Sequence, residues 1–305
     1  IAASYCTAAA DAVGASRCSR LSFGGVESGL IHSAEPALHR PSRAIRRMRE
    51  DMRVVLPVAW TLFVRGQQAT YRQSILRYVW LVVPLVATTI VWVFLDDSGV
   101  LGIESTGTPY PVYVASGTML WQIFVDGLNA PLRKLNGARE VLAKTRVPHE
   151  TWIIAGMLDA LLAALIRGLL IIVLLIAYGI GAEPSMLLVV PGTFALLLLG
   201  MAIGLALAPI GLLYQDIGQA LTILVGFWFF LTPVVYVTPS AGGAATWIVH
   251  LNPVTPLLVT TRSWLVGSGD VMPTAMAVVT SLAACGLGLA WLAYRVSTPH
   301  LVARL

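Results

Sequence analysis

The stretch Tyr71–Phe94, YRQSILRYVWLVVPLVATTIVWVF, decides the fold of this chain. Its head is basic, with Arg72 and Arg77, and the remainder is a long apolar run with a single proline, Pro84. A helix needs about 20 mostly apolar residues to cross a bilayer. The stretch therefore predicts a membrane-spanning helix whose basic end marks the point of entry.

The composition of the 305-residue chain indicates the same environment for the rest of the sequence. Hydrophobic residues make up 57% of it, charged residues make up 11%, and the mean hydropathy is +0.79. Soluble domains carry about 25% charged residues. We therefore predict an all-α integral membrane protein, with no room for an ATP-binding or other soluble catalytic domain. Cys6, Cys18 and Cys285 show neither metal-ligand spacing nor the pattern of a disulfide framework.

Hydropathy predicts six spans, over residues 76–95, 111–131, 152–179, 186–213, 217–237 and 273–294. The net charge is +5, and positive residues orient membrane helices because they gather on the cytoplasmic side. Nine arginines lie between Arg40 and Arg77, and the loop 132–151 holds five more basic residues. The loop 95–110 holds three acids and no Lys or Arg. Both termini are expected in the cytoplasm. Basic segments beside a first span are routine, so we expect no nucleic-acid partner.

The part that precedes the first span has two sections. Residues 1–40 are rich in Ala, Ser and Gly, show no clear period and lack the apolar core of a signal peptide, so we expect a disordered or added upstream segment. In residues 41–70, apolar side chains recur every three or four residues between arginines, namely Ile45, Met48, Met52, Val55 and Ala59. This period predicts an amphipathic helix in the membrane interface. A soluble helix packed on a partner is the alternative.

A charge lies deep in the third predicted span. Arg167 occupies a position where insertion of a charge costs about 2.5 to 3.5 kcal/mol. Asp159 is eight residues away. That spacing is about 80° around a helix, so the two residues do not form a simple same-face pair. Arg167 is expected to face a cavity or a partner subunit, or to extend toward the interface.

Small residues in the fourth predicted span indicate close helix packing. Gly200, Gly204 and Ala208 are spaced by four, which lets another helix approach the backbone. Packing within one subunit is favoured over a dimer contact. Pro209 is then expected to bend the helix.

The segment 238–268, between the fifth and sixth spans, is unusual for a loop. It contains two short apolar stretches, Ala244–Leu251 and Val254–Val266, separated by Asn252 and Pro253. Each stretch is too short to span, a length that suits a re-entrant or interfacial helix. On the outer side, two such helices would form a gate over an exit.

Several of these stretches resemble the permease subunits of bacterial type-two ABC exporters of the polysaccharide, O-antigen and teichoic acid group. The matching residues are Tyr71, Gln73, Ser74, Leu76, Trp80, Pro84 and Leu85 in the first span, Asn136, Leu142, Lys144, Pro148 and Glu150 in the inner loop, and Asp216, Pro233, Tyr236, Asn252, Pro253 and Arg262 farther on. The resemblance covers residues 45–300 in order. Arg77 stands where the family usually has glycine, and Gln215 where it usually has arginine, which leaves the substrate subgroup open.

The resemblance implies a homodimer of six-span permeases in the bacterial cytoplasmic membrane, joined to two separate ATP-binding cassette subunits. These partners would bind ATP and Mg, so the chain itself would hold no cofactor and would not be an enzyme. The implied activity is export of a lipid-linked glycan, of the O-antigen or teichoic acid type. Eighteen arginines against two lysines are typical of a GC-rich coding sequence, so a cell-wall galactan is a further candidate. The implied outer gate comprises Trp247, Asn252, Pro253 and Arg262.

The resemblance also implies that the inner loop holds the element that couples the permease to the ATPase. Its residues would be Lys144, Arg146, Pro148, His149 and Glu150. Mixed charge offers ion pairs to a soluble partner, and Pro148 fixes a helix boundary. The alternative is that the basic residues serve only the topology.

A glycan path is expected to carry aromatic side chains, because sugar rings stack their apolar faces on aromatics while their hydroxyl groups keep polar partners. The candidates are Trp80, Trp92, Trp121, Phe227, Trp228, Phe230 and Tyr236. Aromatic residues also form interfacial belts in any membrane protein, and this is the alternative.

Three other classes of membrane protein are alternatives. An ABC permease for a drug or other small molecule would share the pattern apart from the aromatics and the short outer helices. A secondary transporter would show repeated halves and paired charges within its spans, and no repeat is visible. A membrane enzyme would show clustered acids or a metal-ligand set. Asp126, Asp159 and Asp216 are scattered, and the sequence HETW at His149–Trp152 lacks the two-histidine zinc motif, so we expect no catalytic residue and no metal site.

Overall fold

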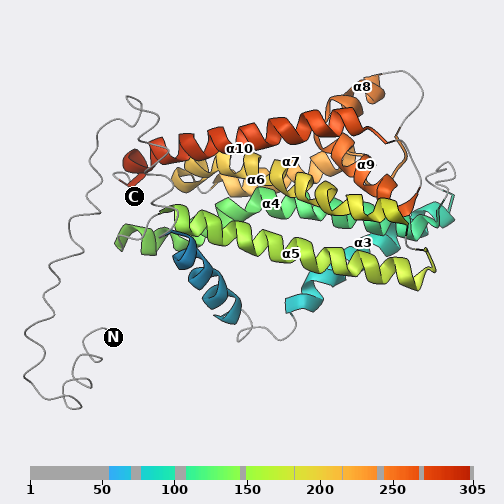
Figure 1. The fold of residues 1–305 in the computed structure, drawn as a ribbon, viewed down its shortest axis with the longest axis horizontal. Coiled ribbons are helices and arrows are strands. Elements are labelled where there is room, and N and C mark those ends of the chain that lie inside the picture. The colour runs from blue at the N-terminus through green and yellow to red at the C-terminus, as the bar shows by residue number, and fades with distance from the viewer. Residues whose placement is uncertain are drawn as a thin grey trace, which may run out of the picture. The chain divides into compact units, whose positions relative to one another are not determined.

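The computed structural model describes residues 55–69, 77–99, 108–144, 149–181, 183–214, 216–238, 244–267 and 271–302. All regular elements in these ranges are helices, and the described residues contain no strand (Figure 1). The predicted all-α fold is therefore confirmed for this part of the chain. The segment 1–40 and the first part of the predicted amphipathic helix lie outside the described residues.

Six long helices occupy the predicted spans. They are α3 (Arg77–Asp97), α4 (Tyr110–Lys144), α5 (His149–Ala177), α6 (Val189–Leu213), α7 (Asp216–Leu231) and α10 (Pro273–Val302). A short 3-10 helix, η3 (Pro184–Leu188), leads into α6. Of the described helices, three are long and apolar enough to cross a membrane, over His149–Ala177, Pro184–Leu213 and Pro273–Ser297, and α7 is a shorter apolar helix. The chain thus has the helices of a multi-pass membrane protein, and the count of six spans stays a prediction.

Three helix ends differ clearly from the prediction, and one of them is the end of α10, which runs to Val302 instead of residue 294. α4 continues to Lys144. The predicted start of the inner loop 132–151 is therefore wrong, because its first part is helical. Hydropathy falls there because the residues are charged, but Leu, Arg, Glu, Ala and Lys are good helix formers and nothing requires the helix to stop at the edge of its apolar part. α7 ends at Leu231 instead of residue 237. Pro233 explains this end, because it has no backbone N–H and disfavours helical geometry in the residue before it.

The two short segments before the last helix are helical, as α8 (Ala244–Leu251) and α9 (Val254–Val266). Pro253 precedes the first turn of α9, and Gly267 ends the helix with a φ of 69°. Glycine adopts this left-handed geometry at no steric cost. The placement of both helices as re-entrant or interfacial elements stays a prediction.

α6 is the central helix of the described fold. It packs between α4 and α10, and α5 packs against the other side of α4 (Figure 1). In the most apolar stretch of the segment Pro184–Leu213, which contains η3 and α6, 61% of the residues are buried. The corresponding share is 22% for α5 and 17% for α10. An added Cβ on Gly200 would lie 2.8 Å from the backbone nitrogen of Leu128, and one on Gly204 would lie 2.9 Å from the carbonyl carbon of Leu128. The predicted close packing at these glycines is confirmed as a contact of α6 with α4 inside one subunit.

The long helices alternate in direction, which gives the bundle two ends. We call them the Asp96 end, where α3 and α5 finish, and the His149 end, where α5 begins and α10 finishes. The main hydrophobic core includes Leu120 and Leu196, and a smaller cluster at the His149 end surrounds Tyr294.

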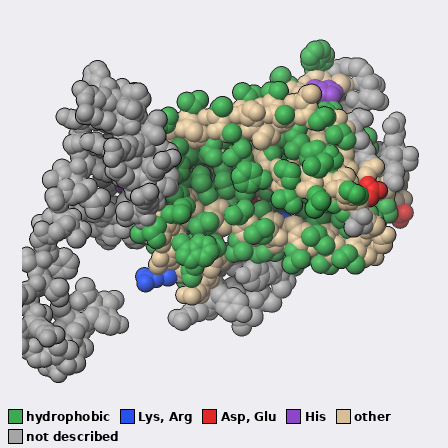
Figure 2. All heavy atoms as spheres, in the orientation of Figure 1, with side chains coloured by type: hydrophobic (Ala, Val, Ile, Leu, Met, Phe, Trp, Pro, Cys, Tyr) green, Lys and Arg blue, Asp and Glu red, His purple; other side chains and the backbone are tan. Residues whose placement is uncertain are grey.

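The outward faces of the helices are apolar. On α5, Leu165, Leu169 and Ile176 are each more than 60% exposed. Figure 2 shows hydrophobic side chains over most of the visible face, with acidic side chains at one end and basic ones at the other. A helix that is hydrophobic on its exposed side as well as on its buried side suits a lipid environment.

The helix over residues 55–69 has two distinct faces. Val55 and Ala59 are buried, whereas Leu56 and Trp60 are 56% and 57% exposed. The two buried residues belong to the apolar period seen in the sequence, and that face packs against the protein. The described part of the predicted amphipathic segment is thus helical, and its place in the membrane interface stays a prediction.

Candidate functional site

The turn over residues 232–238, between α7 and α8, is held by a buried arginine. Arg262 of α9 is only 3% exposed, and its Nη1 donates hydrogen bonds to the carbonyl oxygens of Pro233, at 3.1 Å, and Val234, at 2.9 Å. The guanidinium also lies 3.7 Å from the ring centroid of Tyr113 in α4. This geometry is that of a cation–π contact. One side chain thereby ties α9 to both α4 and the turn.

Burial shifts the ionisation of this arginine. It lowers the pKa of the Arg262 guanidinium to about 10, while the adjoining Tyr113 acts in the opposite direction. The group still carries its charge at neutral pH. The two carbonyl groups and the aromatic face supply the negative partial charge that a buried cation requires.

The first two turns of α4 hold the same segment through tyrosines and a glycine. The hydroxyl groups of Tyr110 and Tyr113 donate to the carbonyl oxygens of Val235, at 3.1 Å, and Tyr236, at 3.0 Å. At Gly117 an added Cβ would overlap the carbonyl oxygen of Val234. The backbone of the turn therefore lies directly on α4, and only glycine permits that approach.

Asn252 joins the end of α7 to the start of α9. Its Oδ1 accepts hydrogen bonds from Nε1 of Trp228 and from the backbone N–H of Val254, both at 3.0 Å. Its Nδ2 donates to Oγ1 of Thr232 at 2.8 Å. Asn252 is 6% exposed, so its amide has little access to water, and these hydrogen bonds satisfy it instead. We call Arg262, Asn252, Tyr110 and Tyr113, with the turn they hold, the gate anchor.

The predicted gate residues therefore have different structural environments. Arg262 and Asn252 are internal anchors, and Pro253 begins α9. Trp247 on α8 is 79% exposed and lies beside other exposed apolar side chains of that helix, Ile248 and Leu251. Of the four predicted gate residues, only Trp247 is largely exposed, so α8 is the part of the predicted gate that offers an apolar surface to a neighbouring molecule.

The predicted path aromatics fall into two groups. Trp121 is 4% exposed and meets Trp228 edge-on, with their ring centroids 6.4 Å apart. Phe124, which the sequence did not single out, lies 5.3 Å from Trp228 in a similar geometry. Edge-to-face pairs of this kind stabilise a core. Trp121 and Trp228 are thus brought together inside one subunit.

The remaining candidates lie farther out. Phe227 and Phe230 are 67% and 62% exposed on the outer face of α7. Trp92 of α3 is half-buried against the main core. Tyr236 is half-buried, and its hydroxyl donates to the carbonyl oxygen of Phe230 at 3.1 Å. The side chain of Trp80 lies outside the described residues. Phe227 and Phe230 are the described candidates best exposed to a substrate.

The predicted coupling residues lie at the His149 end. The segment 145–148 and the side chain of Lys144 are outside the described residues. Glu150, in the first turn of α5, faces α10, and its Oε1 lies 3.4 Å from Nε of Arg295. The first turn of α5 is therefore joined by an ion pair to the last helix, a link that the sequence reasoning did not find.

Arg167 has a partner that the sequence reasoning also missed. Its Nη1 contacts Oδ2 of Asp126 in α4, and the two residues are 4% and 7% exposed. Arg133 lies 3.7 Å from the other carboxylate oxygen. Asp159 instead pairs with Lys134 at 2.7 Å. Asp126 and Asp159 therefore each join α4 to α5 by an ion pair. The sequence signal that could have revealed the pair of Arg167 and Asp126 is one charged residue in each of two neighbouring predicted spans.

Most of the residues described above lie within a match to a known protein family. The family described as ABC-2 type transporter matches residues 57–266. This chain belongs to the ABC-2 type transporter family. The resemblance noted from the sequence is confirmed at the level of the family. All residues of the gate anchor lie inside the matched range of this ABC-2 transporter, whereas Arg295 lies beyond it.

Two relatives are permeases by name. The chain is 24% identical over 200 residues to the O-antigen export system permease protein RfbA of Myxococcus xanthus, which covers 65% of this chain and 76% of that protein. It is 21% identical over 197 residues to the protein of the same name from Klebsiella pneumoniae, which covers 63% of this ABC-2 transporter and 73% of the relative.

Proposed function

We propose that this chain is the transmembrane permease subunit of an ATP-driven exporter of a lipid-linked polysaccharide. The observation that carries the proposal is the family match over residues 57–266, together with relatives named as O-antigen export permeases. Two copies of the permease form a homodimer, and two separate ATPase subunits bind ATP and Mg and hydrolyse the nucleotide. The chain itself supplies the passage.

The proposed topology has six spans in the bacterial cytoplasmic membrane, with the His149 end inside. Support comes from the charges, since Arg133, Lys134 and Arg295 gather near that end and Asp96 and Asp97 lie at the other. Positive residues mark the cytoplasmic side of such helices. The gate anchor is then on the outer side, where an exported chain leaves.

The outer face of α7 is the proposed wall of the path. Phe227 and Phe230 are exposed there, and a second permease that faces them would close a passage lined with aromatic rings. Rings of this kind hold sugars by stacking on their apolar faces. Trp228, on the same helix, binds Asn252 of the gate anchor. A shift of α7 is thereby passed to α9 at the exit.

The inner segment 144–150 is the proposed contact with the ATPase. Glu150 is the last residue of this segment, and its ion pair with Arg295 connects the segment to α10. We infer that movement of the coupling segment reaches α10 through this pair. The cluster around Tyr294, which contains Ile153 of α5 and Ala290 of α10, gives the same two helices an apolar contact.

Reconstituted transport tests this function. The permease and its ATPase are placed in proteoliposomes with lipid-linked glycan extracted from the native membrane, and access of an external lectin to the glycan is followed with and without ATP sealed inside the vesicles, so that only complexes whose ATPase faces the lumen are energised and export brings the glycan to the outer leaflet. We expect ATP to increase access, and a hydrolysis-deficient ATPase to abolish the increase. Phe227→Ala is expected to reduce it more than Phe227→Trp. If the glycan does not move and a panel of small hydrophobic drugs stimulates ATP hydrolysis, the chain is a drug permease instead.

A further inference from the structure

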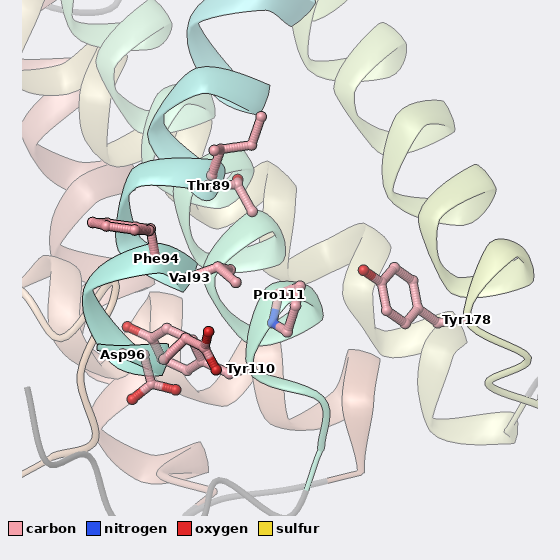
Figure 3. Close-up of a pocket in the computed structure, with 9 residues that line it drawn as sticks. Thr89, Val93, Phe94, Asp96, Tyr110, Pro111 and Tyr178 are labelled. Atoms are coloured by element: carbon pink, nitrogen blue, oxygen red, sulfur yellow. The ribbon is translucent and has the colours of Figure 1, made fainter. Parts of the chain in front are cut away.

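A pocket of about 630 Å³ lies at the Asp96 end, between the last turns of α3, the first turn of α4 and the end of α5. Figure 3 shows Tyr178 across the hollow from α3, with Pro111 between them and Asp96 beside Tyr110. Its volume is in the range of pockets that hold small ligands, about 300 to 1,000 Å³. No role for this pocket follows from the proposed transport path along α7.

The pocket has a negative rim. Asp96 and Asp97 are the last two residues of α3 and line the hollow, and none of the described lining residues is Lys or Arg. Neither carboxylate forms an ion pair with a described residue. The C-terminus of a helix carries a partial negative charge, so two acids there repel the helix dipole. A bound cation would relieve that repulsion.

Two tyrosines give the pocket preformed aromatic walls. Tyr178 follows α5, and the backbone bonds Gly179 N–H to Ile176 and Ile180 N–H to Leu175 fix its position. Gly179 has the φ of 68° that this kind of helix end requires. Tyr110 belongs to the gate anchor, and its ring stacks on that of Tyr113 with centroids 6.5 Å apart. Aromatic faces beside carboxylates favour ammonium groups.

The inner wall is apolar and continues onto the exposed surface of α3. Val93 and Pro111 line the pocket, and Ile90 and Phe94 are 61% and 69% exposed at its edge. A ligand that fits has an apolar part along α3 and a positively charged head at the acidic rim. Anionic amphiphiles do not fit, since their heads would meet two carboxylates.

We propose that this pocket binds the primary-ammonium headgroup of a zwitterionic phospholipid, with Asp96 and Asp97 accepting hydrogen bonds from the ammonium beside the ring of Tyr110, and with the rest of the lipid lying between α3 and the ring of Tyr178 across the hollow. An ammonium has three N–H donors and no acceptor, which matches a site made of acceptors and aromatic faces. Because Tyr110 also holds the turn over residues 232–238, an occupied pocket stabilises the gate anchor. The inference requires a membrane but not a glycan substrate.

Lipid retention in nanodiscs tests the proposal. The full-length chain, assembled with its ATPase, is placed in nanodiscs of phosphatidylglycerol with an equal amount of phosphatidylethanolamine, and lipids that remain bound are identified by native mass spectrometry. We expect phosphatidylethanolamine to be retained in preference to phosphatidylglycerol. The double variant with Asp96→Asn and Asp97→Asn is expected to lower that preference about fivefold. This factor corresponds to the largest stabilisation that an exposed ion pair usually supplies.

Matched variants separate this site from a general effect of charge or folding. Asp216→Asn removes an exposed acid from the first turn of α7, at the His149 end, and should leave the preference unchanged. Tyr178→Phe should keep it, because the ring remains, and Tyr178→Leu should reduce it. Equal retention of the two lipids by the unaltered protein would overturn the proposal. An undiminished preference in the double acid variant, or the same loss in Asp216→Asn, would overturn it too. Glycan transport can fail or succeed in either case, since lipid retention is measured without it.

Discussion

Replacing Gly204 with alanine is expected to force α4 and α6 apart. The new Cβ would lie 2.9 Å from the carbonyl carbon of Leu128 and 3.2 Å from its Cα, with the carbonyl oxygen nearer still. Carbon atoms pack best at about 3.5 to 4.0 Å, so the helices must separate by about 1 Å. A gap of 0.5–1 Å forfeits about a quarter to a half of the attraction between facing atoms. Overpacking of a core costs about 1 to 3 kcal/mol.

The assay is reversible unfolding in bicelles, with the free energy of unfolding measured for each variant. Gly168→Ala is the matched control, because Gly168 lies within α5 and no atom of a neighbouring group is within 4 Å of the added Cβ. That change should be neutral or stabilising by up to about 1 kcal/mol, the propensity difference between the two residues. If the free energies of unfolding of Gly204→Ala and Gly168→Ala agree within about 0.5 kcal/mol, the difference is no larger than the usual error in comparing single substitutions, and the packing argument is refuted.

Three further predictions concern charged residues. Asp126→Asn should destabilise the protein by about 3 to 5 kcal/mol, because it leaves the buried Arg167 without its partner; adding Arg167→Gln should recover part of this in the same unfolding assay, and strict additivity would contradict the pair. Arg262→Met should remove two hydrogen bonds to the turn and increase the hydrogen exchange of residues 232–238 by about tenfold or more, the equivalent of about 1.4 kcal/mol; unchanged exchange there would exclude Arg262 as an anchor. Glu150→Lys should lower the amount of glycan exported per ATP, and Arg295→Glu in the same chain should restore it; failure of the reversed pair to restore coupling would exclude this link.

Local signals predicted the bounds of α8 and α9 well. The bounds of α8 and α9 coincide with the two apolar stretches read from the sequence, because Asn252 and Pro253 interrupt the first and Gly267 ends the second. Residues of this kind act on the backbone within one or two positions, so their effect is visible without a fold. The end of α4 was missed because hydropathy reports where lipid contact ends, and a helix can continue in water.

Contacts between helices were less accessible to sequence reasoning. The pairing of Arg167 with Asp126 joins two helices, and spacing along one helix cannot reveal it. Trp121, Phe227 and Trp228 are chemically alike, yet two of them pack inside the subunit and one is exposed. Which side of a helix faces the core depends on its rotation. From Ile223 to Leu231 α7 is apolar on all sides, so this part of its sequence gives no preferred face.

The buried pair of Asp126 and Arg167 also constrains how the protein is made. The two residues are 41 positions apart, on helices that leave the ribosome one after the other. At about 5 to 20 residues per second, Arg167 is synthesised about 2 to 8 seconds after Asp126. During that interval α4 carries a carboxylate whose partner does not yet exist, at an insertion cost of about 2.5 to 3.5 kcal/mol. α4 is therefore expected to wait beside the translocon until α5 arrives, so that the two helices enter the lipid as a pair.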